Sequence, residues 1–195
     1  GYTGIRIRGI NSQSTNVTIN GIPYNDAESL GTFWVDLPDF SSSVENLQVQ
    51  RGIGTSVNGS SAFGASINIL TDKIAEKSFF ESSNTVGSFN TIKNNFKFST
   101  GLLNNAFEFS GRLSKIDSDG YIDRASSNLK SYFLQFSYKK NKTLLKFLNF
   151  GGHEITYQAW NGIDLLTLEN NRTYNPSGLY FDLDGNEKFH ENEVD

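Results

Sequence analysis

VENLQVQRGIGTSVNGSSAFGASINILT, residues 44–71, is the stretch that decides the fold of this chain. It begins with a strand pattern over residues 46–50 and ends with a second one at Ile67-Asn68-Ile69. Four glycines stand between these patterns, and they permit tight backbone turns and close approach to a neighbouring surface. The stretch therefore predicts two short strands joined by a turn-rich connection.

Shorter strand patterns precede this stretch. Residues 5–9 (IRIRG) and 16–21 (NVTING) alternate and end at turn residues, so each predicts a strand. Residues 38–43 favour a short helix just before the strand at 46–50. This mixture predicts a small α+β domain, and any glycine-rich α+β domain fits the short strands equally well.

A different pattern begins at residue 79. AFEFSGRLS, residues 106–114, places its phenylalanines, glycine and leucine on one face and its charged and serine residues on the other. Residues 94–99 and 131–138 alternate likewise. Period two over such lengths predicts strands with one apolar and one polar face. We expect five of these strands, at residues 79–87, 91–101, 106–117, 129–139 and 143–157.

Composition changes near the middle of the chain. Residues 1–72 contain no lysine but hold nine of the eighteen glycines, and all eleven lysines fall at Lys73 or later. No proline lies between Pro38 and Pro176, which suits continuous sheet because proline removes a ladder hydrogen bond. We expect an N-terminal domain over 1–72, a linker over 73–78, five strands within 79–157 and a long loop from 158 to 195.

Bulk composition argues against several functional classes. A net charge of -4 and a pI near 5.2 disfavour a nucleic-acid binder, which needs a basic face. The chain has no cysteine and only two well-separated histidines, so we expect no metal site and no cofactor. It has neither a Gly-x-Ser-x-Gly elbow nor a phosphate-binding Gly-Lys-Ser/Thr loop, so we expect no catalytic residue and no enzyme.

The connections between the predicted strands alternate in length. Short turns at 103–105 and 139–142 contrast with a longer connection that starts at Asp117. This alternation is typical of a transmembrane barrel, which has tight turns at one rim and longer loops at the other. An antiparallel sandwich or adhesin also has alternating strands, so the periodicity by itself leaves both architectures open.

An ordered motif runs through the 44–71 stretch: Val49, Arg51, Gly52, Thr55, Gly59, Ala62, Gly64, Ile67, Asn68, Ile69 and Thr71. With it the chain resembles the TonB-dependent outer-membrane receptors, in the form found in Bacteroidota. Residues 5–9 and 17–26 resemble earlier strands of the same family's plug domain, and residues 119–123 and 153–162 resemble early barrel segments. The chain departs from the family pattern at Gln48, Ile53, Asn58 and Ala65, where the family has glutamate, proline, tyrosine and glycine.

The resemblance implies a fold. Residues 1–72 are expected to form the C-terminal part of an α+β plug domain, followed by the first antiparallel transmembrane strands of a large β-barrel. A barrel of about 22 strands has a wide lumen that a plug must block. Five strands cannot close such a barrel, so we expect a fragment that by itself neither transports nor is stable in water.

The resemblance also implies roles for individual residues. Arg8 and Arg51 are expected to hold the plug to the barrel by bidentate pairs with barrel carboxylates, and the alternative is a surface ion pair worth about 0–1 kcal/mol. By residue type alone, Tyr157 and Trp160 are candidates for stacking on a ligand, since aromatic rings stack on sugars and flat ligands, and the alternative is an interfacial aromatic belt or loop packing. The plug-motif residues are Gly9, Gly21, Gly52, Gly59, Gly64 and Asn68.

The implied function is active import of a scarce nutrient across the bacterial cell outer membrane. The implied partners are a TonB-type energising protein at the inner membrane, outer-membrane lipid and a small-molecule substrate that undergoes no chemistry. An iron–siderophore complex is the first expectation, a glycan delivered with a surface lipoprotein the second, and a vitamin the third. A non-transporting surface β-protein or adhesin is the alternative from another class.

Overall fold

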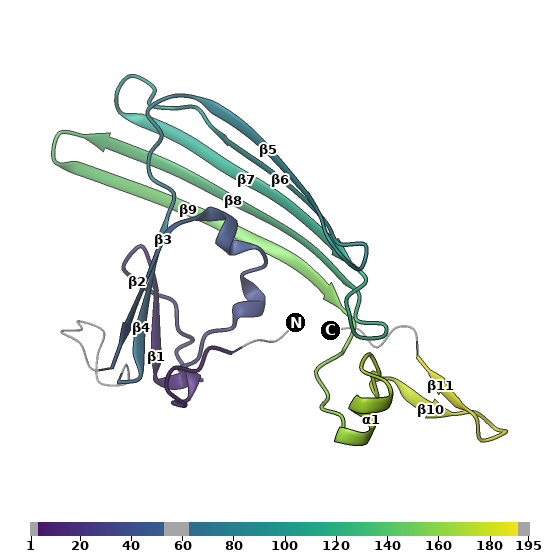
Figure 1. Ribbon diagram of the computed structural model, residues 1–195. Coiled ribbons are helices and arrows are strands. Elements are labelled where there is room, and N and C mark those ends of the chain that lie inside the picture. Colours follow the sequence, from purple (N-terminus) through teal and green to yellow (C-terminus); the bar gives the residue numbers. More distant parts are fainter. Residues whose placement is uncertain (1–3, 53–62, 191–195) are drawn as a thin grey trace.

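The computed structural model describes residues 4–52 and 63–190 of the chain. These residues form two main bodies, a small N-terminal domain and a long curved sheet that arches over it (Figure 1). No helix among them is long and apolar enough to cross a membrane.

The N-terminal domain is built on a mixed sheet with the strand order β2-β1-β4-β3. β1 runs parallel to β4, and β2 and β3 pair antiparallel at the two edges. Three 3-10 helices accompany the sheet, at Ser12–Ser14, Trp34–Asp36 and Phe40–Ser43. The four strands are β1 (Thr15–Ile19), β2 (Ile22–Pro23), β3 (Val44–Arg51) and β4 (Ala65–Thr71).

The second body is an antiparallel sheet in which neighbours in sequence are neighbours in space. Its turn residues include Asn104, Asn105 and Asn141, each with φ between 50° and 54°, a left-handed backbone that asparagine tolerates. Its strands are β5 (Phe79–Val86), β6 (Ile92–Ser99), β7 (Phe107–Ser118), β8 (Ser127–Lys140) and β9 (Thr143–Thr156). All five overlap the strands that the period-two pattern predicts.

The long sheet reverses the burial of an ordinary soluble sheet. On β7 the polar Glu108, Arg112 and Ser114 are buried, whereas Phe109 and Leu113 on the opposite face are exposed. The same holds on β8, where the buried polar side chains are Ser131, Gln135 and Ser137 and the exposed aromatic ones are Tyr132 and Phe136. A face of this kind suits a strand with lipid on one side and a polar interior on the other.

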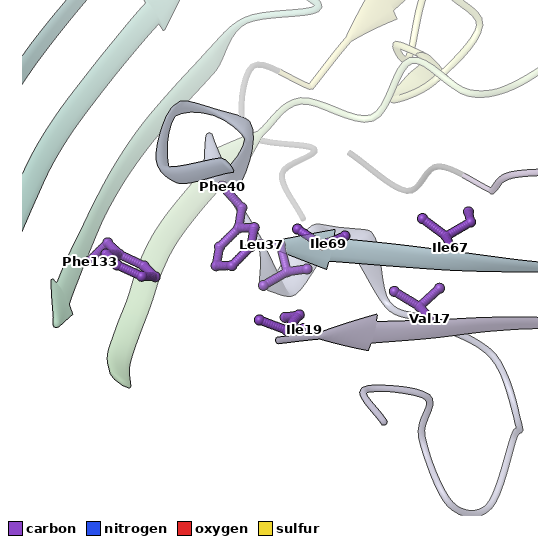
Figure 2. Close-up of a cluster of buried hydrophobic side chains, with 7 residues drawn as sticks. All are labelled: Val17, Ile19, Leu37, Phe40, Ile67, Ile69 and Phe133. Carbon is purple, nitrogen blue, oxygen red and sulfur yellow. The ribbon is translucent and has the colours of Figure 1, made fainter. Parts of the chain in front are cut away.

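One apolar core joins the two bodies. Val17 and Ile19 from β1 pack with Ile67 and Ile69 from β4, and the cluster includes Phe133 of β8 in the long sheet. Figure 2 shows Leu37 and Phe40 between the small sheet and β8. The domain therefore completes its core against the long sheet and not by itself.

The chain beyond β9 is more structured than a plain loop. It contains a helix, α1 (Leu165–Asn170), and a hairpin of β10 (Leu179–Phe181) and β11 (Glu187–Phe189). Arg124, from the connection between β7 and β8, lies 3.9 Å from the ring centre of Phe189 and donates to the carbonyl oxygen of Asn175. The two connections at this end of the sheet thus pack as one unit.

The strand predicted over residues 5–9 is wrong. Arg8 and Gly9 have φ values of 54° and 76°, and the amide of Ile10 donates to the carbonyl oxygen of Ile7. The backbone therefore turns at these residues, and only an isolated bridge joins Ile7 to Ile10. The alternating Ile-Arg pattern therefore belongs to a turn and not to a strand paired in a sheet.

The reversed burial generates the first prediction. In the intact protein, Phe136→Arg places a cation on the exposed apolar face, between its cross-strand neighbours Phe109 and Phe147. We expect folding into lipid vesicles to lose about 2–4 kcal/mol, the cost of a cation near the bilayer midplane. Denaturant titration of vesicle-inserted protein measures it.

Lys130→Gln is the matched control, because Lys130 lies on the same face of β8 nearer the strand's other end, beside Lys115. Its change is expected to stay below about 1 kcal/mol, as near a membrane interface. Equal losses for both variants would contradict a lipid-facing side.

Candidate functional site at the domain–sheet interface

Asp39 is the point at which the N-terminal domain is fastened to the long sheet. It lies between two 3-10 helices in a left-handed conformation with φ 51°, which turns its carboxylate toward the sheet. One oxygen, Oδ1, accepts from Lys93 Nζ at 2.6 Å, and the other, Oδ2, accepts from Arg112 Nη1 at 3.0 Å. Ser114 of β7 donates to Oδ2 as well. One carboxylate thus binds two strands of the sheet.

Arg112, in the middle of β7, is the buried cation that pairs with this carboxylate. Its side chain is 2% exposed and that of Asp39 is 5% exposed, so the ion pair is shielded from water. The guanidinium Nε donates to Ser43 Oγ at 2.7 Å, which gives a second bond to the same 3-10 segment. Hydrogen bonds that involve charged groups are roughly twice as strong as neutral ones, so this cluster is a strong link.

The protonation of Asp39 reflects its surroundings. Burial by itself raises the pKa of this carboxyl group, but hydrogen bonds from Lys93, Ser114 and Ser42, together with the charge of Lys93, outweigh it and lower the pKa below its ordinary value. Asp39 is therefore ionised at neutral pH, as the ion pair requires.

A second polar cluster lies where the N-terminal domain leads into the long sheet. Asp72 Oδ1 accepts from Lys97 Nζ at 2.8 Å, and its carbonyl oxygen accepts from Lys146 Nζ at 3.1 Å. Thr71 Oγ1 donates to Gln135 Oε1 at 3.3 Å. This cluster ties the end of β4 to β6, β8 and β9.

Apolar contacts complete the interface between the two clusters. Phe40 lies edge-on to Phe150 of β9 and Phe133 of β8, with ring centroids 5.1 and 5.9 Å away. Pro38 approaches β9 so closely that a Cβ on Gly152 would lie 2.2 Å from its Cγ. Glycine at position 152 is therefore needed for the 3-10 segment to reach the sheet.

The two arginines expected to hold the domain lie elsewhere. Arg8 and Arg51 are exposed, and neither forms an ion pair or a side-chain hydrogen bond with a residue that the structure describes. Their predicted role needs carboxylates outside these five strands and stays a prediction. In the described interface the polarity is opposite, with the acid on the domain and the bases on the sheet.

Most plug-motif residues have a visible backbone role. Gly9, Gly21 and Gly52 have φ of 76°, 81° and 78°, a region that L side chains rarely adopt. A Cβ on Gly64 would lie 2.9 Å from the carbonyl oxygen of Ser14. Asn68 accepts a hydrogen bond from Thr18 across the parallel pair at 2.8 Å. Gly59 lies outside the described residues.

The two aromatic ligand candidates differ in accessibility. Tyr157 is buried, and its hydroxyl group donates toward the carbonyl oxygens of Ser177 and His190, so in this structure it packs the loop unit. Trp160 is 72% exposed and offers an accessible aromatic surface. A ligand contact stays a prediction for both.

The residues that make the interface were not predicted from the sequence. Arg112 carries a usable signal, because a charged residue on the polar face in mid-strand is costly unless it is paired. Asp39 carries none, since an aspartate after a proline in a loop is commonplace. Among the described residues, no group of three His, Asp or Glu side chains is placed to hold a metal ion.

Comparison with known proteins gives a consistent result. Residues 1–66 match the family model described as TonB-dependent Receptor Plug Domain. A search of curated proteins finds no significant match.

Solved structures extend the similarity over most of the chain. The ferripyoverdine receptor of the Pseudomonas aeruginosa outer membrane aligns with a TM-score of 0.64 and 15% identity over 95% of this chain and 23% of its own. The ferric citrate transporter FecA gives 0.70 and 17% over 90% and 28%, and the ferric yersiniabactin receptor FyuA of Yersinia pestis gives 0.64 and 18% over 92% and 29%. At these identities the likeness concerns the fold, and this chain spans about a quarter of each relative's length.

The buried ion pair generates the second prediction. In the intact protein, Asp39→Asn leaves the Arg112 cation buried without a carboxylate, and such a loss costs about 3–5 kcal/mol. We expect faster hydrogen exchange at the backbone amides of the Phe40–Ser43 helix, measured by mass spectrometry. Glu45→Gln is the control, because it breaks only the exposed pair with Lys73, and exposed pairs contribute little to stability. Equal protection in the two variants would contradict a fastening role for Asp39.

The lowered pKa of Asp39 generates a third prediction. A carboxyl group whose folded pKa lies below its unfolded one contributes stability above the unfolded pKa, and loses that contribution as the pH falls through the folded pKa. We therefore expect amide protection in the Phe40–Ser43 helix to be constant from pH 7 to about pH 4 and to fall below that. The Asp39→Asn variant should lack this acid-dependent step, and a step of the same size in both would argue against Asp39 as its source.

Proposed function

Because this chain belongs to the TonB-dependent receptors of the bacterial outer membrane, we propose that the receptor containing it imports a scarce nutrient across that membrane. The observation that carries the proposal is the small domain held against the polar face of a sheet whose other face is apolar. A domain in this position blocks the space that the sheet encloses. Import then requires the domain to shift, and this step needs energy.

We further propose limits for the parts. Residues 1–72 belong to the plug, residues 79–157 to the first five strands of the barrel wall, and residues 158–195 to an extracellular loop. β4 ends at Thr71 and β5 begins at Phe79, which supports a linker between the two. Asp39 precedes β3 in the sequence and Asp72 follows β4, so the plug contacts the wall just before and just after these two strands.

The proposed energy source is a TonB-type protein at the inner membrane. The fastening described above is strong, since it combines a buried ion pair, a second charged cluster and a shared apolar core. Spontaneous release of the plug is accordingly rare, and an external pull is the simplest way to move it. The substrate passes unchanged, so the proposed receptor is a transporter and not an enzyme.

The proposed substrate is an iron–siderophore complex. Similar folds include the ferripyoverdine and ferric yersiniabactin receptors, and those ligands belong to those proteins. The motif variant of residues 44–71, which resembles iron-type receptors, adds to this choice. A glycan or a vitamin would use the same fold and is an outcome of the test.

Uptake by the native host tests this function and is the fourth prediction. Deleting the receptor gene is expected to abolish growth on ferric siderophores as the sole iron source and uptake of the same complexes carrying radioactive iron. Deleting the energising protein should give the same loss, and the intact gene supplied in trans should restore uptake. Unchanged iron uptake together with lost growth on a glycan would transfer the function to glycan import, and no transport phenotype at all would leave a surface β-protein.

A further inference from the structure

The plug-facing side of the wall carries a group of cations, which we call the basic wall. It consists of Lys93 and Lys97 on β6, Arg112 on β7 and Lys146 on β9. Three strands thereby contribute, and Lys97 and Arg112 are direct cross-strand neighbours. Since strand side chains alternate, these cations share the face that the plug covers.

The carboxylates that pair with the basic wall belong to the plug, one in the loop before β3 and one directly after β4. Lys93 and Arg112 share Asp39, and Lys97 pairs with Asp72 at 2.8 Å. Lys146 reaches the backbone carbonyl oxygen of Asp72 at 3.1 Å. The plug thus supplies two negative side chains to four cations of the wall.

The wall itself has three acids among its described residues on this face, and none of them forms an ion pair with the basic wall. Glu108 is buried on β7, where Ser99 donates to its Oε1 at 2.7 Å. Glu81 on β5 is exposed and lies opposite Lys97 across the strand pair, and Glu154 lies near the far end of β9. Withdrawing the two plug carboxylates therefore leaves four cations against three wall carboxylates, and it removes the ion-pair partners of Lys93, Lys97 and Arg112.

Space for a polar ligand already exists beside these cations. A cavity of about 240 Å³ lies between Ser42 of the plug and the wall. The wall lines it with two cations and one carboxylate, Lys93, Lys97 and Glu81, and with the polar Ser83, Thr85 and Asn95. Asn95 Oδ1 is buried there without a hydrogen-bond partner among the described residues. This oxygen can accept a hydrogen bond from a donor group of a ligand, whereas Lys93 and Lys97 supply the positive charge.

We propose that the basic wall is an anion-binding surface for the substrate, occupied by Asp39 and Asp72 in the closed receptor and by the substrate's own anionic groups once the plug shifts. Unpaired cations within narrow, low-dielectric walls focus the field and concentrate anions. The substrate class is therefore a complex bearing carboxylate or other oxyanion groups. Such a substrate also offsets the cost of unpairing Arg112, because it replaces the lost partner. This inference rests on the proposed import function and names its ligand chemistry.

Charge-selective labelling of a single thiol in the full-length receptor tests the proposal. This chain has no cysteine, so Asn95→Cys introduces one between Lys93 and Lys97, in a full-length receptor from which any cysteine outside this chain has been removed. Energised cells are treated with an anionic or a cationic methanethiosulfonate reagent of matched size, and each rate is divided by that of a free thiol. We expect the anionic reagent to be favoured on the order of tenfold, the lower end of electrostatic steering.

Two further variants make the result specific. Lys93→Gln with Lys97→Gln, in the Asn95→Cys background, should remove the preference, even though a loosened plug raises both rates. Leu183→Cys, at the fully exposed turn between β10 and β11 and flanked by Asp182 and Asp184, should not favour the anionic reagent. Because the preference is a ratio, changes in overall access cancel.

The outcomes separate this inference from the proposed function. If radioactive iron uptake depends on the energiser but the thiol introduced by Asn95→Cys reacts without anion preference, or never reacts, the inference is overturned. If uptake is absent and energising the cells leaves the reactivity of that thiol unchanged, the import function itself fails. Anion preference that appears with the energiser and disappears in the lysine variant supports both.

Discussion

The buried ion pair between Asp39 and Arg112 is the interaction on which this arrangement depends. A guanidinium in the middle of a strand cannot remain buried beside apolar groups without a partner, because taking an unpaired charge out of water costs several kcal/mol. Its carboxylate comes from a left-handed residue between two 3-10 helices, so the pair joins two regions 73 residues apart. The plug is positioned by this requirement as much as by its apolar core.

The reversed pattern of the long sheet follows from the same physics. Its polar inner face suits contact with the plug, and its apolar outer face suits contact with lipid. Phe133 and Phe150 are apolar residues on the inner face, and they lie where Phe40 inserts from the plug. At this place the wall is apolar inside because the plug supplies apolar surface.

Through these contacts the plug supplies the negative charges that neutralise cations of the wall. The cations Lys93, Lys97 and Arg112 have their carboxylate partners on the plug side. In the import mechanism that we propose, movement of the plug removes these carboxylates and so changes the electrostatics beside the wall. Under this proposal the side chains that fasten the plug are also those that attract the substrate, which would explain why the bases are on the wall and the acids on the plug.

The sequence by itself determined the architecture and left the pairing of charges to the tertiary structure. Period-two alternation depends only on adjacent residues, so it located β7, β8 and β9 within a few positions, although it failed at residues 5–9, where the pattern covers a turn. Asp39 and Arg112 meet only because of the chain's path through the small sheet and back along β7. Arg51 belongs to the most recognisable motif, yet it is exposed. The ion pair that holds the plug to the sheet is instead formed by Asp39, a loop residue that belongs to no motif. Charge pairing depends on three-dimensional proximity and on exclusion of water, and neither quantity is encoded in any short stretch of residues.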